Sequence, residues 1–182
     1  SSAASDVYKR QERTKGISMK EELRQHEKRL VIHDLPAGAM PAVKDENIIE
    51  ICDDGSIKSC IGCFGCWLKT PGKCILKDKY NEMGRLLAGS GEILLISRCC
   101  FGGPGPFVKN VLDRSIPYIL PYFVIKNGEM HHRQRYRKTL ALRVVFYGED
   151  LTEQEKETAR EWVDAMADNL YLSLIHISEP TR

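Results

Sequence analysis

The chain has 182 residues, of which 42% are hydrophobic and 29% charged, and its formal net charge is +2. This length and balance predict one soluble globular domain and give no general reason to expect nucleic acid as a partner. The longest apolar run, residues 93–96, is far too short to span a bilayer, so we expect no membrane segment.

Both ends of the chain look foreign to the domain between them. Residues 1–11 and 172–182 resemble translated sequencing-adapter read-through, so we expect two non-native extensions and exclude them from the fold. Residues 12–28 are expected to form a charged helical lead-in, and residues 29–171 the domain itself. On this interpretation the natural chain begins near Met19 and is cut short after Tyr171, and the fold then lacks its last element.

The first half of the domain shows strand and helix patterns in alternation. Residues 30–33 form a short apolar strand, and Ile48–Cys52 form a second, which ends at an Asp-Asp-Gly turn. Asp78 is placed to cap a helix that runs to about Leu87. Residues 93–97 are apolar on both faces, which predicts a central parallel strand.

The second half continues the same alternation. A glycine loop at residues 102–105 precedes a helix with an apolar face over residues 107–112, and an Asn-Gly pair predicts a hairpin at residues 123–132. Residues 140–147 form the fourth strand, and Thr152 with Glu155 makes a capping box for the last helix. This pattern predicts an open parallel sheet in the order two, one, three, four, with helices on both faces.

Four cysteines lie within fifteen residues: Cys60, Cys63, Cys66 and Cys74. Structural zinc usually takes two separated Cys-x2-Cys pairs, whereas three successive i+3 steps and a later fourth cysteine favour a four-iron four-sulfur cluster. The spacing differs from that of bacterial ferredoxins. The alternative is a turn lined by ordinary reduced cysteines, and a disulfide framework is the weaker rival because seven cysteines is an odd number. We therefore expect a reducing cytoplasmic compartment.

The string CIGCFGCWLKTPGKC at residues 60–74 resembles the cysteine loop of the iron–sulfur flavoprotein and NAD(P)H-dependent FMN reductase branch of the flavodoxin-like superfamily. Residues 97–114 are similar to the family segment that lies along the flavin ring. The resemblance covers residues 29–171. It implies a flavodoxin-like three-layer α/β sandwich with an open parallel sheet.

The resemblance also implies a function and its residues. The four cysteines would ligate a 4Fe-4S cluster, NAD(P)H would reduce FMN, and the cluster would pass single electrons to an acceptor that the sequence does not identify. By carry-over, the flavin ring would be lined by Ser97, Arg98, Cys99, Cys100, Phe101, Gly102, Gly103, Tyr147 and Gly148. No side chain is expected to act as a catalytic acid or base. A homo-oligomer is expected, and both loops are expected at the carboxyl edge of the sheet.

One departure from the family concerns the FMN phosphate. The link from His33 to Glu46 contains Pro36, Gly38 and Pro41 and has no Ser or Thr, so the usual phosphate loop is missing. We therefore expect free FMN to bind weakly to the isolated subunit. The alternative function is a degenerate flavodoxin-like module that binds a cluster or a protein partner without FMN and without turnover.

Two other features have two interpretations each, and Cys52 and Trp67 have one expectation each. Cys99 and Cys100 either face the flavin or are semi-buried apolar residues, and Cys52 is expected in the core. The basic stretch at residues 131–138 either attracts the phosphates of NADPH or a nucleotide partner, or is a solvated hairpin face. Trp67 is expected to cover the cysteine loop. No Ser/His/Asp set and no carboxylate pair has a spacing that suggests hydrolysis.

Overall fold

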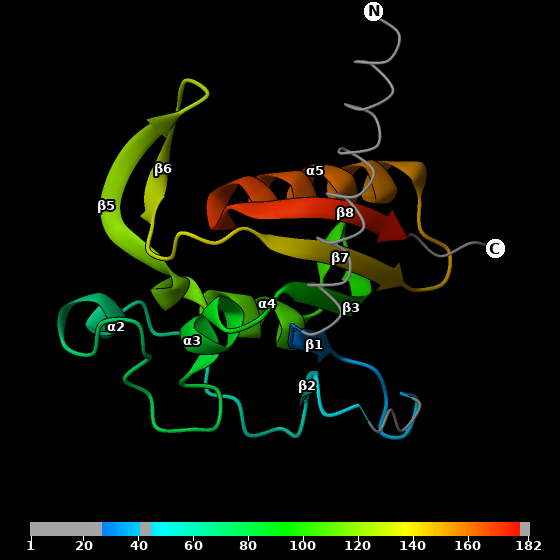
Figure 1. Ribbon diagram of the computed structural model, residues 1–182. Helices are drawn as coiled ribbons and strands as arrows, with labels where there is room; N and C mark the ends of the chain where they lie inside the picture. Colours follow the sequence, from blue (N-terminus) through cyan, green and yellow to red (C-terminus); the bar gives the residue numbers. More distant parts are fainter. Residues whose placement is uncertain (1–26, 41–44, 179–182) are drawn as a thin grey trace, which may run out of the picture.

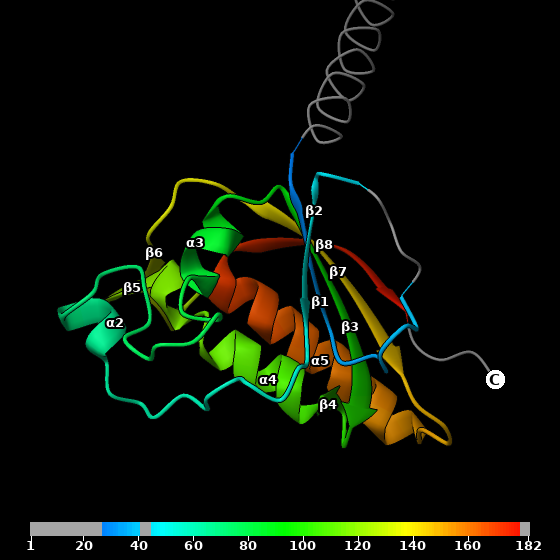
Figure 2. The same ribbon diagram turned by 90° about the horizontal axis from the view of Figure 1, so that it is seen from below.

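A parallel sheet organises the computed structural model, which describes residues 27–40 and 45–178 (Figures 1 and 2). Its strands lie in the order β2-β1-β3-β7-β8, and every neighbouring pair in this order is parallel. Their bounds are Arg29–His33 (β1), Ile48–Cys52 (β2), Glu92–Cys100 (β3), Leu140–Tyr147 (β7) and Leu172–Ser178 (β8). This is the strand order of flavodoxin-like folds, so the predicted α/β class and order are confirmed.

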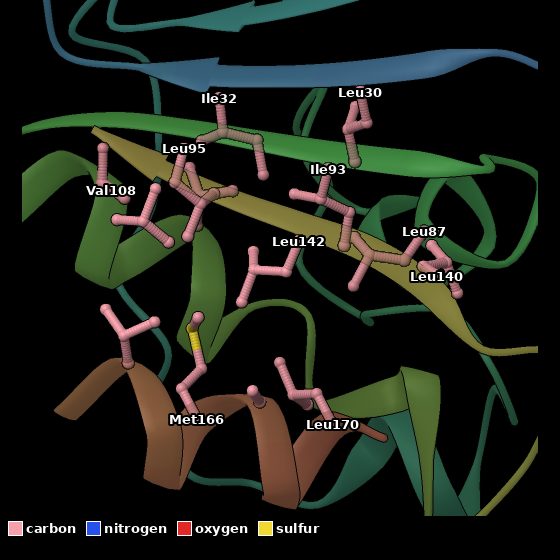
Figure 3. Close-up of a cluster of buried hydrophobic side chains, with 14 of the residues drawn as sticks. Leu30, Ile32, Leu87, Ile93, Leu95, Val108, Leu140, Leu142, Met166 and Leu170 are labelled. Atoms are coloured by element: carbon pink, nitrogen blue, oxygen red, sulfur yellow. The ribbon is translucent and has the colours of Figure 1, made fainter. Parts of the chain in front are cut away.

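One face of the sheet carries the core. Leu30 is paired with Ile93, and Ile93 with Leu142, so side chains at these positions project to the same side. Helices α3 (Met83–Ala88), α4 (Pro106–Asp113) and α5 (Glu153–Leu170) pack on that side (Figure 3). Their contributions to the core are Met83, Leu87, Phe107, Val108, Val111, Ala159, Val163, Met166, Ala167 and Leu170. The hydrophobic effect therefore holds sheet and helices together across a single layer boundary.

The opposite face of the sheet carries Val31 and His33, both of which are buried. The described helices all lie on the other side of the sheet (Figure 2). The helical lead-in expected over residues 12–28 lies outside the described residues except at its last two positions. No helix in the described part is both long and apolar enough to cross a membrane.

The hairpin β5 (Ile119–Lys126) and β6 (Glu129–Gln134) projects away from the sheet (Figure 1). Its turn residues Asn127 and Gly128 both have positive φ, 54° and 85°, as the Asn-Gly pair predicts. A short 3-10 helix, η1 (Ile116–Tyr118), connects α4 to the hairpin. The hairpin is therefore joined to the end of α4 through this one short turn of helix.

The capping box of α5 is present, since Thr152 accepts from the N–H of Glu155 while the Glu155 carboxylate accepts from the N–H of Thr152. The predicted start of α3 at Asp78 was wrong. α3 begins at Met83, because the carboxylate of Asp78 accepts hydrogen bonds from Arg114 and does not cap a helix. An aspartate before an apolar helical pattern, such as Asp78, can be either the N-cap of that helix or the partner of a buried cation, and the sequence does not distinguish the two.

The C-terminal segment joins the sheet. Leu172–Ser178 pairs parallel with β7 as β8, so the exclusion of residues 172–178 from the fold left out a strand that the structure contains. Pairing in the sheet does not bear on the origin of these residues. The non-native origin of residues 172–182 stays a prediction. The remaining described strand, β4 (Gly103–Pro104), pairs antiparallel with the end of β3.

Candidate metal centre and the carboxyl edge of the sheet

The four clustered cysteines all line one cavity of about 440 Å³. Cys60 and Cys63 are exposed, Cys66 is buried and Cys74 is partly buried. The short helix α2 (Gly65–Leu68), which the sequence did not reveal, turns the chain back so that Cys74 can face the other three. The reversal is held by backbone bonds, among them the N–H of Gly72 to the carbonyl of Cys66 at 3.2 Å.

The spacing of these thiols bears on which metal they could hold. In the described residues no three of the four sulfurs lie within 4.8 Å of one another. Tetrahedral zinc with Zn–S bonds of about 2.3 Å would place its sulfur ligands about 3.8 Å apart. The thiols are therefore not drawn together around a single ion, and four thiols that line one cavity are the donor type and number that a 4Fe-4S cluster takes.

Burial, together with the neighbouring Cys74, raises the pKa of the Cys66 thiol to about 11. Metal ligation requires the thiolate, and the positive charge of a bound metal supplies the stabilisation that the protein surroundings withhold. The chemistry of the donor set thus fits a site completed by a metal centre.

Arg114 closes the inner side of this cavity, and its side chain is fully buried. Its Nε donates to the sulfur of Cys74 at 3.1 Å, and its two terminal nitrogens donate to the carboxylate of Asp78 at 2.8 and 2.7 Å. Nη1 also donates to the carbonyl of Lys58 at 2.6 Å. Hydrogen bonding to Arg114 lowers the pKa of Asp78. Sequence reasoning missed this role, because the residues lie 36 to 56 positions from Arg114.

Aromatic rings form the outer wall. Phe64 stacks on Trp67 with centroids 5.6 Å apart, and Trp67 lies 5.0 Å from the ring of His132 in the hairpin. The indole of Trp67 donates to the carbonyl of Ile119 at 3.0 Å. Trp67 therefore ties the cysteine loop to the hairpin and lines the cavity.

The cysteine cavity and the glycine loop lie at opposite ends of α4 (Figure 2). Arg114 follows the last residue of α4, whereas the glycine loop precedes its first residue, and eight residues of helix span about 12 Å. After β2 the chain runs back alongside α4, where the N–H of Cys60 donates to Asn110 at 3.3 Å. The prediction that both loops share the carboxyl edge was therefore wrong.

At the carboxyl edge, three of the residues expected around a flavin converge on Asp34, the first residue after β1. The hydroxyl of Ser97 and the N–H of Arg98 donate to its carboxylate at 2.8 and 2.9 Å. The hydroxyl of Tyr147 donates to its carbonyl at 3.0 Å. Asp34 thus bridges β1 and β3, which is the topological switch point of this strand order.

The other residues expected around the flavin point in different directions. Cys99 is buried in the core, whereas Phe101 is 93% exposed. Gly102 packs so closely on α5 that a Cβ there would lie 2.6 Å from the Cβ of Thr158. Cys100, Gly103 and Gly148 are partly buried.

FMN carries an anionic phosphate, and the donors nearest to the switch point already hold the Asp34 carboxylate. A side chain at Gly105, the N-cap of α4, would also collide with that carboxylate. The Asp34 carboxylate therefore fills the space next to the helix N-terminus. The residues present at the carboxyl edge therefore do not fit an FMN phosphate.

The basic stretch in the hairpin is partly built into the structure. His131 is buried and its Nδ1 lies 3.1 Å from the amide oxygen of Asn169, and Arg135 donates to the carbonyl of Pro117 at 2.9 Å. These two residues are therefore not part of a solvated face.

No protein-family model matches the sequence, and no curated protein matches it. Two similar solved structures are an NADPH-quinone reductase from P. pentosaceus and general stress protein 14 from Treponema denticola in complex with FMN. Each is 13% identical with a TM-score of 0.46 and covers 84% of this chain, and the matches cover 83% and 84% of those chains, respectively. Because this likeness is distant, we infer function from the site itself.

Proposed function

We propose that this protein is an electron-transfer oxidoreductase whose redox centre is a 4Fe-4S cluster held by the four clustered cysteines. The observation that carries the proposal is the convergence of four thiols on one cavity. Such a cluster would supply reversible one-electron transfer. The chain's own residues would hold the cluster, exclude water from its inner side and set its electrostatic surroundings.

The two sides of the cavity suit different tasks. Cys66 is buried and Cys74 is partly buried beside Arg114, so these two would anchor the centre on the protected side. Cys60 and Cys63 are exposed, so an electron acceptor could approach the cluster from their side. We propose that electrons leave on this side. We also propose that the acceptor is a separate molecule, which the sequence does not identify, and that the protein forms a homo-oligomer.

The electron donor distinguishes two forms of this function. In the first, which the family resemblance implies, the protein is an NAD(P)H-dependent flavin oxidoreductase, and the flavin ring would lie near Ser97, Arg98 and Tyr147. In the second, the protein is a flavodoxin-like module that holds a cluster without a flavin. The Asp34 carboxylate at the switch point favours the second form in the isolated subunit.

Anaerobic purification followed by iron, sulfide and flavin assays tests the proposal. We expect about four iron and four sulfide per chain. A protein that holds zinc alone, or no metal at all, would overturn the cluster. Flavin bands near about 370 and 450 nm in the purified protein would favour the first form over the second.

Substitution of one ligand provides the matched test. Cys66→Ser should lose iron and brown colour together, because it removes the one ligand of the four that is buried. Cys100→Ser is the control, since Cys100 ends β3 and does not line the cavity. Equal iron in both variants would remove Cys66 from the ligand set.

A further inference from the structure

Arg114 places a buried cation against one sulfur of the cysteine cavity. Its side chain is fully buried, and its Nε–H points at the sulfur of Cys74 over 3.1 Å. A guanidinium has five N–H groups in a rigid planar fork. Here the terminal nitrogens are used by Asp78 and by the carbonyl of Lys58, which leaves the Nε edge for the sulfur.

The Asp78 carboxylate fixes this orientation. Its two oxygens bind the two terminal nitrogens side by side, and a bidentate contact of this kind sets the plane of the guanidinium. Asp78 is itself held by the N–H of Lys58 at 3.1 Å and the N–H of Tyr80 at 3.1 Å. The direction of the Nε–H bond toward Cys74 is therefore determined by a network and not by one flexible side chain.

A simple ion pair between helix and loop would explain Asp78 and Arg114 without any role at the cavity. It does not explain why the guanidinium presents its remaining edge to a cysteine, where a thiol is only a weak acceptor. A thiolate that ligates a metal is a far better acceptor for a charged donor. The contact is most useful when Cys74 is deprotonated.

We propose that Arg114 is a positioning residue that sets the reduction potential of the redox centre through its hydrogen bond to Cys74. The inference rests on the proposed cluster. One-electron reduction adds a negative charge to the cluster and its thiolates, and a donor directed at a ligand sulfur stabilises that added charge. Arg114 therefore raises the potential, and Asp78 moderates it by neutralising part of the cation.

The test is a redox titration of the anaerobically purified, cluster-containing protein, followed by absorbance and electron paramagnetic resonance. Arg114→Lys keeps a cation for Asp78 but removes the planar Nε donor, so the potential should fall. We expect the equilibrium constant for one-electron reduction to drop about tenfold, which corresponds to about 59 mV. Asp78→Asn leaves the guanidinium without its counter-ion, so the potential should rise.

Opposite shifts in these two variants are the distinguishing result, because a purely structural ion pair would weaken folding in both and move the potential in neither. Arg143→Lys is the control, since Arg143 pairs with Glu92 on the sheet away from the cavity. If Arg114→Lys does not retain iron, Asp78→Asn decides alone. Wild-type protein without iron would refute the proposed function, whereas a bound cluster with unchanged potentials would refute only the role of Arg114.

Discussion

Free FMN is expected to bind the isolated chain no more tightly than riboflavin, because the phosphate finds its donors occupied. The hydroxyl of Ser97 and the N–H of Arg98 both hold the Asp34 carboxylate. Hydrogen bonds to charged groups contribute about 1.5–3 kcal/mol each, so a phosphate that took both donors would displace about 3–6 kcal/mol of contacts. Repulsion between carboxylate and phosphate adds to this cost.

Removal of the carboxylate should reverse the preference. Asp34→Gly frees both donors and opens space beside Gly105 at the N-terminus of α4. We expect FMN to gain about tenfold over riboflavin in this variant, which is about 1.4 kcal/mol. Asp34→Asn removes the charge but keeps one acceptor, so its gain should be smaller. Asp53→Asn is the control, because Asp53 accepts from Gly55 within its own exposed turn.

Isothermal titration of the metal-free monomer with FMN, riboflavin and inorganic phosphate measures these differences. Inorganic phosphate reports on the anion site without any contribution from the ring. A wild-type preference for FMN of about 100-fold, near 2.7 kcal/mol, would show a second phosphate cradle and refute the reasoning. In that case Arg98 and the basic stretch at residues 131–138 are the first places to search. Equal phosphate binding by wild type and Asp34→Gly would equally refute it.

Three further outcomes are expected. The ion pair with Arg114 lowers the pKa of Asp78, so it stabilises the fold above the unfolded-state pKa of about 3.9, and this stabilisation is lost as pH falls through the folded-state pKa. In urea unfolding, the difference in unfolding free energy between wild type and Asp78→Asn should therefore shrink below about pH 4. In metal-free protein at pH 8, mass spectrometry should find Cys66 alkylated by iodoacetamide far more slowly than the two exposed cysteines of the loop, because its thiol pKa is about 11; equal rates would contradict its burial. Gly102→Ala should cost more unfolding free energy than Gly38→Ala, since both have φ near 80° but only Gly102 meets Thr158; the shared backbone cost is about 1–2 kcal/mol and the clash adds about 1–3 kcal/mol, so equal losses would exclude the clash.

Local signals in the sequence were sufficient for most of the secondary structure. The capping box at Thr152 and the Asn127–Gly128 turn depend on contacts within four residues, so the chain specifies them by itself. The apolar run at residues 93–97 predicted the central strand, and β3 does lie in the middle of the sheet, although it continues to Cys100 and every second residue is only partly buried or exposed. The spacing of the four cysteines likewise placed them in one short segment.

Contacts between distant residues were decided only by the tertiary structure. Asp78 is suited to an N-cap, yet Arg114, 36 residues away, holds its carboxylate. The position of the cysteine loop followed from its return along α4, which depends on the fit of Cys60 against Asn110, 50 residues away. Asp34 meets Ser97 across 63 residues because β1 and β3 are neighbours in the sheet. A periodic pattern encodes which face of an element is buried, whereas the partner on that face depends on how the layers pack.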